Sequence, residues 1–166
     1  LMTAFVLYTF GTNSILFLRV PYWSDSGVPA DWLSLGVASD PFVVMGLTVV
    51  FGYLAERYSL ASLNLLGGVA RLVSMLPMLV VSPSALWVFA HTLPWGLGSA
   101  GMVTGQNLAI PPYFGRRSQG AIRGFTAPVM IGAGAISPPL AGWLIDSQVL
   151  SQHTTFILAG FLMLAA

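Results

Sequence analysis

Long apolar stretches alternate with short polar connectors along the whole chain. A helix needs roughly 20 apolar residues to cross the hydrocarbon core of a bilayer. The pattern predicts helices at about 1–20, 33–55, 60–81, 85–112, 124–145 and 155–166. These stretches are too long and too uniformly apolar for barrel strands. We therefore expect an all-α membrane protein, with a six-helix bundle in a single domain over residues 1–166 and a first and last helix cut by the ends of the chain.

The composition supports lipid as the main solvent. Hydrophobic residues make up 56% of the chain and charged residues 7%, whereas a soluble domain carries about 25% charged residues. A net charge of +1 gives no electrostatic reason for a nucleic-acid partner. The absence of cysteine from the sequence excludes a disulfide framework and a thiolate site within it. The expected partners are the bilayer and a small molecule, and no cofactor is expected.

The basic residues predict the orientation of the chain. Three of the six arginines lie in one connector, YFGRRSQGAIRG, between two apolar stretches. Short cytoplasmic loops of membrane proteins are enriched in arginine and lysine. The cytoplasmic face would carry Arg57, Arg116, Arg117 and Arg123, and the opposite face Arg19, Asp25, Asp31 and Asp146. We expect a multi-pass protein of a bacterial cytoplasmic membrane.

Glycine and proline mark where helices pack or bend. Small residues let helix backbones approach closely in lipid, and proline bends a helix axis. The predicted packing positions are Gly101, Gly105, Gly132, Gly134, Pro138, Pro139 and Gly142. Kinked, closely packed helices suit a protein that rocks between conformations, and they equally suit any dense bundle.

Catalytic signatures are missing from the sequence. It has no H-E-x-x-H, G-x-S-x-G or P-loop pattern, and its acidic residues are too scattered for a metal site. Gly96, Gly98 and Gly101 match a dinucleotide-binding string, but no strand precedes them and no acid follows at the required spacing. These glycines are interpreted as packing residues, and we expect the protein not to be an enzyme.

Two charged residues are predicted inside the membrane. Ionisable residues in membrane spans are rare and are candidates for functional sites. Asp40 and Arg71 lie on consecutive antiparallel helices at depths that differ by only a few ångströms, at about 1.5 Å per residue. A pair between them would offset the desolvation of each charge. In one interpretation Arg71 binds an anionic substrate and Asp40 carries a proton. In the other, the pair only ties two helices together.

Two motifs resemble the major facilitator superfamily of secondary transporters. Gly52 to Arg57, GYLAER, is similar to the G-x-L-A-D/E-R signature after the second span, although the basic residues that follow in the family are missing here. The arginine connector, followed by PLAGWLID at Pro139–Asp146, looks like the region around spans ten and eleven. The resemblance covers almost the whole chain and implies one six-helix half, with the C-terminal half favoured and the other half as its partner. It assigns orientation and gating roles to Gly52, Glu56, Arg57, Arg116, Arg117 and Arg123.

The resemblance also implies two inverted three-helix repeats whose first helices line the substrate path. The candidate path residues are Asn13, Asp40, His91, Trp95, Ser99, Gln106 and Asn107, with Thr9 and Thr12 nearby. His91 either titrates or is hydrogen-bonded to its neighbours, and the family layout favours a helix-tying role for Arg71. Val20-Pro21-Tyr22 with Asp25-Ser26-Gly27 is similar to a motif of monocarboxylate and oxalate–formate type members, which implies a small organic anion. The alternative is a non-transporting membrane component, without a polar path between the first and fourth helices.

Overall fold

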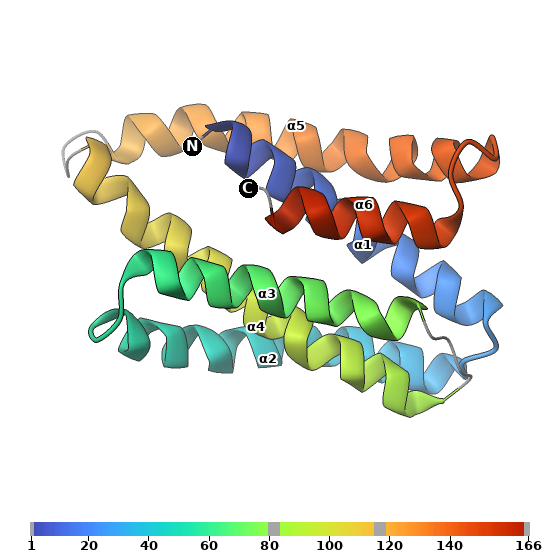
Figure 1. The fold of residues 1–166 in the computed structure, drawn as a ribbon. Helices are drawn as coiled ribbons and strands as arrows, with labels where there is room; N and C mark the ends of the chain where they lie inside the picture. The colour runs from blue at the N-terminus through green and yellow to red at the C-terminus, as the bar shows by residue number, and fades with distance from the viewer. Residues whose placement is uncertain (1, 80–83, 115–118, 165–166) are drawn as a thin grey trace.

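The computed structural model describes residues 2–79, 84–114 and 119–164, which form six helices. They are α1 (Met2–Asp25), α2 (Ala30–Ala55), α3 (Leu60–Leu79), α4 (Ala85–Phe114), α5 (Gln119–Asp146) and α6 (Gln152–Leu164) (Figure 1). By length and apolar composition, α1, α2, α3 and α5 could each span a membrane. The predicted class, an all-helical chain compatible with a membrane, is confirmed at this level.

The first connector is much shorter than the sequence predicted. Pro21 to Trp32 was expected to be a polar loop, but α1 continues through Pro21 to Asp25 and α2 begins at Ala30. Proline inside a helix removes one backbone hydrogen bond, but Pro21 does not end α1. The helix continues because Tyr22 and Trp23 both find buried positions against other helices. Gly27 then makes the turn with a φ of 84°, a conformation that glycine adopts without strain.

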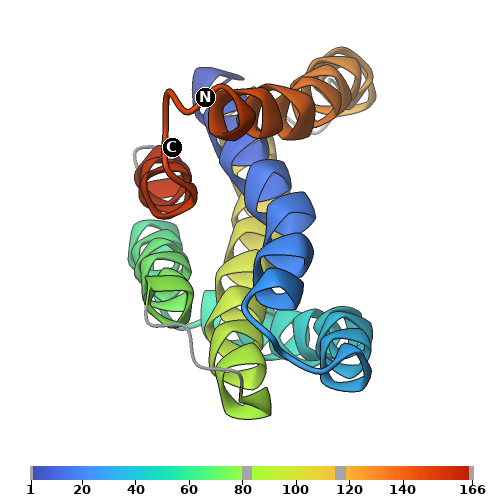
Figure 2. The same cartoon turned by 90° about the vertical axis from the view of Figure 1, so that its right-hand side faces the viewer.

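The helices form three layers when viewed from one end of the bundle. In Figure 2, α1 and α4 lie in the middle, α3 and α6 lie together on one side, and α2 and α5 lie on the other. The buried core residues Ile15, Trp23, Met78, Val88 and Phe156 join α1, α3, α4 and α6. The outer faces of α2 and α5 remain apolar and exposed, as at Phe42 and Phe125, each 70% exposed.

The contacts between helices repeat in two matching sets. α4 packs against α2 and α3, and α1 packs in the same way against α5 and α6, while α3 and α6 pack against each other. Exchanging α1 with α4, α2 with α5 and α3 with α6 leaves this pattern unchanged. α1 and α4 run in opposite directions along the bundle (Figure 1). Within the described residues, the units α1–α3 and α4–α6 are therefore arranged as an inverted repeat.

Charged connectors separate to the two ends of the bundle. The α2–α3 turn, with Glu56 and Arg57, lies at the same end as the start of α5, which carries Arg123 (Figure 1). Asp31 and Asp146 lie in or beside the connectors at the other end. Arg57 and Arg123 are thus on one face, as predicted, whereas Arg116 and Arg117 fall outside the described residues.

The predicted packing glycines fall into two groups. A Cβ added at Gly101 would lie 3.1 Å from the Cα of Gly67, so α3 and α4 approach closely there. Gly105 meets Asn64 of α3, and a Cβ at Gly134 would lie 3.1 Å from Asn13 of α1. Gly132 and Gly142 have no such neighbour within 4 Å in the described part of the chain. The described helices therefore make no close contact at these two glycines, and their packing role stays a prediction.

The proline-rich part of α5 stays helical. Pro138 and Pro139 both lie inside α5, with Pro139 exposed. Each removes a backbone donor from the helical ladder, so the preceding turn loses hydrogen bonds there.

Candidate binding site between α1, α3 and α4

One face of α4 carries several polar and aromatic residues along the bundle interior. His91, Trp95, Ser99, Met102 and Gln106 follow one another at spacings of three or four residues. Residues at this spacing lie above one another on one side of a helix. This face is turned toward α1 and α3, so the sequence places a continuous stripe of functional groups along the middle of the bundle.

Arg71 of α3 reaches this stripe from the side. Its Nη2 donates hydrogen bonds to the hydroxyl of Tyr8, at 2.7 Å, and to Oγ of Ser99. The guanidinium lies over the ring of Trp95, 3.7 Å from its centroid, in a cation–π contact. The side chain runs across Gly98, where a Cβ would lie 2.7 Å from Cδ of Arg71. Glycine at this position therefore leaves the space that the arginine occupies.

The guanidinium of Arg71 is buried and incompletely satisfied. Only 2% of the residue is exposed, and its Nε and Nη1 have no hydrogen-bond partner among the described residues. Arginine presents five N–H donors and stays charged in proteins. A buried cation with free donors is unfavourable unless an anion or polar group completes its shell.

Asp40 pairs with Arg19, not with Arg71 as the sequence suggested. Nη2 of Arg19 donates to Oδ2 of Asp40, and both residues are buried. The prediction failed because Arg19 was placed at the outer end of its helix. Since α1 continues to Asp25, Arg19 lies six residues inside that end, level with Asp40 of the next helix.

Trp95 lies beside both arginines. The guanidinium of Arg19 is 5.5 Å from the centroid of the Trp95 ring. The same ring makes the cation–π contact with Arg71. His91 stacks on Trp95 with ring centroids 5.2 Å apart, and its Nδ1 lies 2.7 Å from the carbonyl oxygen of Ser74. Because a carbonyl can only accept, Nδ1 of His91 carries the proton and donates. The neighbouring groups therefore fix the tautomer and position of this histidine.

A cavity of about 260 Å³ opens beside Arg71, between α1 and α4. Its polar lining comes from α1, α3 and α4, and Met102, Val103 and Met130 supply an apolar side. The polar lining residues are Tyr8, Thr9, Thr12, Asn13, Arg71, Ser99 and Gln106. This mixture of one cation, several neutral hydrogen-bonding groups and an apolar side suits a small anion with a short carbon skeleton.

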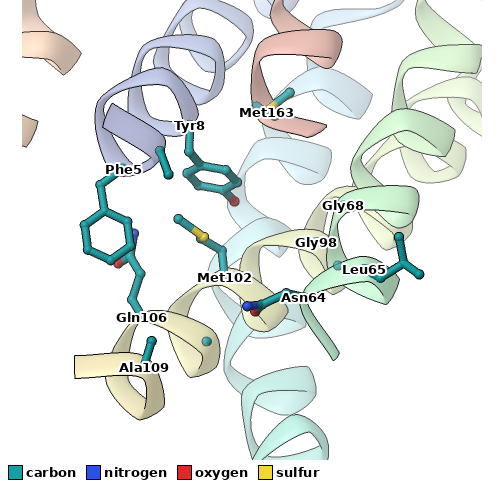
Figure 3. Close-up of a pocket in the computed structure, with 13 residues that line it drawn as sticks. Phe5, Tyr8, Asn64, Leu65, Gly68, Gly98, Met102, Gln106, Ala109 and Met163 are labelled. Atoms are coloured by element: carbon teal, nitrogen blue, oxygen red, sulfur yellow. The ribbon is translucent and has the colours of Figure 1, made fainter. Parts of the chain in front are cut away.

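A second cavity of about 320 Å³ lies on the side of α3 and α6 (Figure 3). It shares Tyr8, Met102 and Gln106 with the first cavity, so these three side chains separate the two spaces. Asn64 is a further polar group there, and Phe5, Leu65 and Met163 make much of the remainder apolar. No charged residue is among the described residues that line it.

The predicted path residues lie in three places: at the smaller cavity, in the buried layer beside it, and near the start of α5. Asn13, Ser99 and Gln106 line the smaller cavity, and Asp40, His91 and Trp95 form the buried layer next to it. Asn107 lies elsewhere, because its Oδ1 accepts a hydrogen bond of 2.8 Å from exposed Arg123 near the start of α5.

The residues assigned to gating lie at the surface of the basic end. Glu56 and Arg57 are exposed, and Arg57 lies over the ring of Tyr53, 4.7 Å from its centroid. Gly52 has open space where a Cβ would be, with no other atom of the described chain within 4 Å. This chain by itself therefore supplies no close helix contact at Gly52.

Sequence reasoning missed three residues of the site. Tyr8 was not noticed because an aromatic residue in an apolar helix has no distinctive signal, and Arg19 was excluded by the misplaced helix end. Asn64 lies close to the start of α3 and is not among the candidate residues that the sequence offered. One signal could have found Tyr8 and Arg19, since they are eleven residues apart and so share one face of α1.

Comparisons with protein-family models, with curated proteins and with solved structures found no match. The resemblance to major facilitator transporters therefore remains an expectation from the sequence. The function is therefore inferred from the geometry and chemistry of the site.

Proposed function

We propose that this chain is one six-helix half of a major facilitator type secondary transporter, and that it carries a small organic anion across the membrane. The observation that carries the proposal is Arg71, a buried guanidinium that lines an open cavity and whose Nε and Nη1 have no hydrogen-bond partner among the described residues. A buried charge inside a membrane bundle is expensive and is generally retained for function.

The balance of buried charge favours an anion. The chain has five acidic residues, and Asp40 is the buried one, whereas Asp25, Asp31, Glu56 and Asp146 are exposed. Asp40 is already paired with Arg19. The buried cluster therefore holds two guanidiniums and one carboxylate, with a net charge of +1 if His91 is neutral. A monoanion in the adjoining cavity would balance this charge.

The arrangement of the helices supports alternating access. Inverted repeats with a site near their interface are typical of secondary transporters, which expose the site to each side in turn by rocking one unit against another. Here the cavity lies between α1 and α4, the corresponding helices of the two units. The exposed apolar faces of α2 and α5 leave room for a second six-helix half, or for lipid.

The alternative, a non-transporting membrane component, makes a different expectation. Such a protein has no need of a polar cavity between α1 and α4, and a buried cation without a counter-ion would only destabilise it. The polar lining of the 260 Å³ cavity therefore favours transport over this alternative.

Counterflow in proteoliposomes that contain the full-length protein tests the proposal. The labelled probes are acetate, lactate, pyruvate and malonate, with glucose as an uncharged comparison. We expect exchange of at least one carboxylate and none of glucose. Arg71→Gln should reduce this exchange at least tenfold, because a charge-assisted hydrogen bond contributes about 1.5–3 kcal/mol. Arg71→Lys should retain part of the activity, because it keeps the charge but loses the paired donors.

The matched control is Asp146→Asn, which removes an exposed charge far from the cavity and should exchange like the wild type. Each variant is compared at equal amounts of monodisperse protein, so that a folding defect is not taken for loss of transport. Full exchange by Arg71→Gln, or no exchange of any carboxylate by the wild type, would contradict the proposal.

A further inference from the structure

In the buried cluster one carboxylate lies near two arginines and pairs with one of them. The proposed function does not explain why. Two guanidiniums, Arg19 and Arg71, lie 5.5 Å and 3.7 Å from the centroid of the same Trp95 ring. A single buried carboxylate, Asp40, is within reach of this layer, and it binds Arg19. The pairing leaves one cation neutralised and the other available at the cavity.

We infer that Asp40 determines the charge of the ligand, making the site selective for a monoanion over a dianion. This inference rests on the proposed function, since it concerns the same cavity. With Asp40 in place, the cluster carries one uncompensated positive charge. A ligand with one carboxylate balances that charge, whereas a second carboxylate would enter without a partner and lose its hydration.

The lining of the cavity agrees with this limit. Apart from Arg71, the described residues that line it are neutral, and the hydroxyls and amides come from Tyr8, Thr9, Thr12, Asn13, Ser99 and Gln106. Neutral donors can hold the oxygen atoms of a hydroxyl or keto group, but they do not balance a second charge. At about 260 Å³ the cavity is also small, close to the lower limit of ordinary ligand pockets.

Arg19 is a positioning residue in this scheme, because it pairs with the carboxylate of Asp40, which would otherwise be unpaired near Arg71. Its partner Asp40 has a second oxygen, Oδ1, without a hydrogen-bond partner in the described chain, and Arg71 has Nε and Nη1 in the same condition. If Arg19 were absent, Asp40 would be an unpaired buried carboxylate near Arg71. It would then compete with the ligand for the remaining cation.

The test compares the binding of pyruvate and malonate to the full-length protein. Both probes have three carbons, but at neutral pH pyruvate is a monoanion and malonate a dianion. The wild type should bind pyruvate at least about tenfold more tightly than malonate, because one charge-assisted partner corresponds to roughly 10- to 100-fold in affinity. In Asp40→Asn, Arg19 becomes a second free cation, so the ratio should shift toward malonate by at least about tenfold.

Two further variants separate this scheme from a structural role of the pair. Arg19→Gln should weaken the binding of both probes at least about tenfold. In this variant the buried cluster keeps Arg71 and Asp40, whose charges cancel. The double variant Arg19→Gln/Asp40→Asn restores a net charge of +1. It should bind pyruvate within about threefold of the wild type and keep the preference for the monoanion. Asp146→Asn is the control and should change neither the affinity nor the ratio.

The outcomes distinguish the inference from the proposed function. If the wild type binds neither probe, the proposed function fails. If Asp40→Asn folds and binds with an unchanged ratio, the inference is overturned. If Asp40→Asn does not fold, because two buried cations then repel each other, the Arg19→Gln and double variants decide. Binding by Arg19→Gln as tight as by the wild type would then overturn the inference.

Discussion

Two glycines that look alike in the sequence should respond to the same substitution with very different losses of stability. A Cβ on Gly101 would lie 3.1 Å from the Cα of Gly67 and 3.1 Å from Cε1 of Phe51, closer than the 3.5–4.0 Å optimum for carbon contacts. Valine at this position adds two more methyl groups, so α3 and α4 must separate. Overpacking of this kind costs about 1–3 kcal/mol, and the better helix propensity of valine returns only a few tenths.

The matched control is Gly132→Val in α5, where no other atom of the described chain lies within 4 Å of the added Cβ. This substitution should change the free energy of unfolding by less than about 0.5 kcal/mol. Unfolding of the full-length protein is followed by circular dichroism during titration with sodium dodecyl sulfate in mixed micelles. A loss of 2 kcal/mol for Gly101→Val would lower the ratio of folded to unfolded protein about 30-fold. Equal stabilities for the two variants would refute the close approach of α3 and α4.

Two other expectations follow from the ends of the bundle. Tyr22 donates a hydrogen bond of 2.7 Å to the carbonyl oxygen of Met78, so Tyr22→Phe should lose about 1–3 kcal/mol in the same titration. The exposed Tyr58→Phe should change little, and equal losses would show that the buried hydrogen bond is unimportant. A membrane-impermeant maleimide should label a single cysteine at Asp146 in intact cells, and a single cysteine at Glu56 only in inside-out membrane vesicles, where the cytoplasmic face is exposed. Labelling of both from one side would contradict the orientation.

Much of the fold could be predicted from the sequence because hydrophobicity acts locally along the chain. The six helices follow from runs of apolar residues, which must bury their backbone polar groups internally in lipid. The position of Asp40 and Arg71 inside the bundle follows in the same way, since both lie well within apolar stretches. Where the prediction failed, at the first connector, proline and acidic residues are local signs of a turn. The buried positions of Tyr22 and Trp23 outweighed these signs.

The glycines of α5 differ in what surrounds them, which the sequence did not indicate. Gly132 and Gly134 differ by two residues, which is a rotation of about 200° around a helix. Gly134 therefore faces Asn13 of α1, while Gly132 faces away from the described chain. A sequence pattern identifies small residues, but the direction in which a helix faces depends on the helices around it.

The sequence by itself determined that this is an apolar helical chain, with its basic connectors at one end and a few charges buried between them. Those properties depend on composition and on position along each helix. The tertiary structure decided which of those charges meet, because three helices bring Arg19, Asp40 and Arg71 to one level beside Trp95. Depth along a helix could not choose between two arginines for one aspartate. The extension of α1 to Asp25 brings Arg19 level with Asp40, and the packing of the helices then pairs these two residues and leaves Arg71 at the cavity.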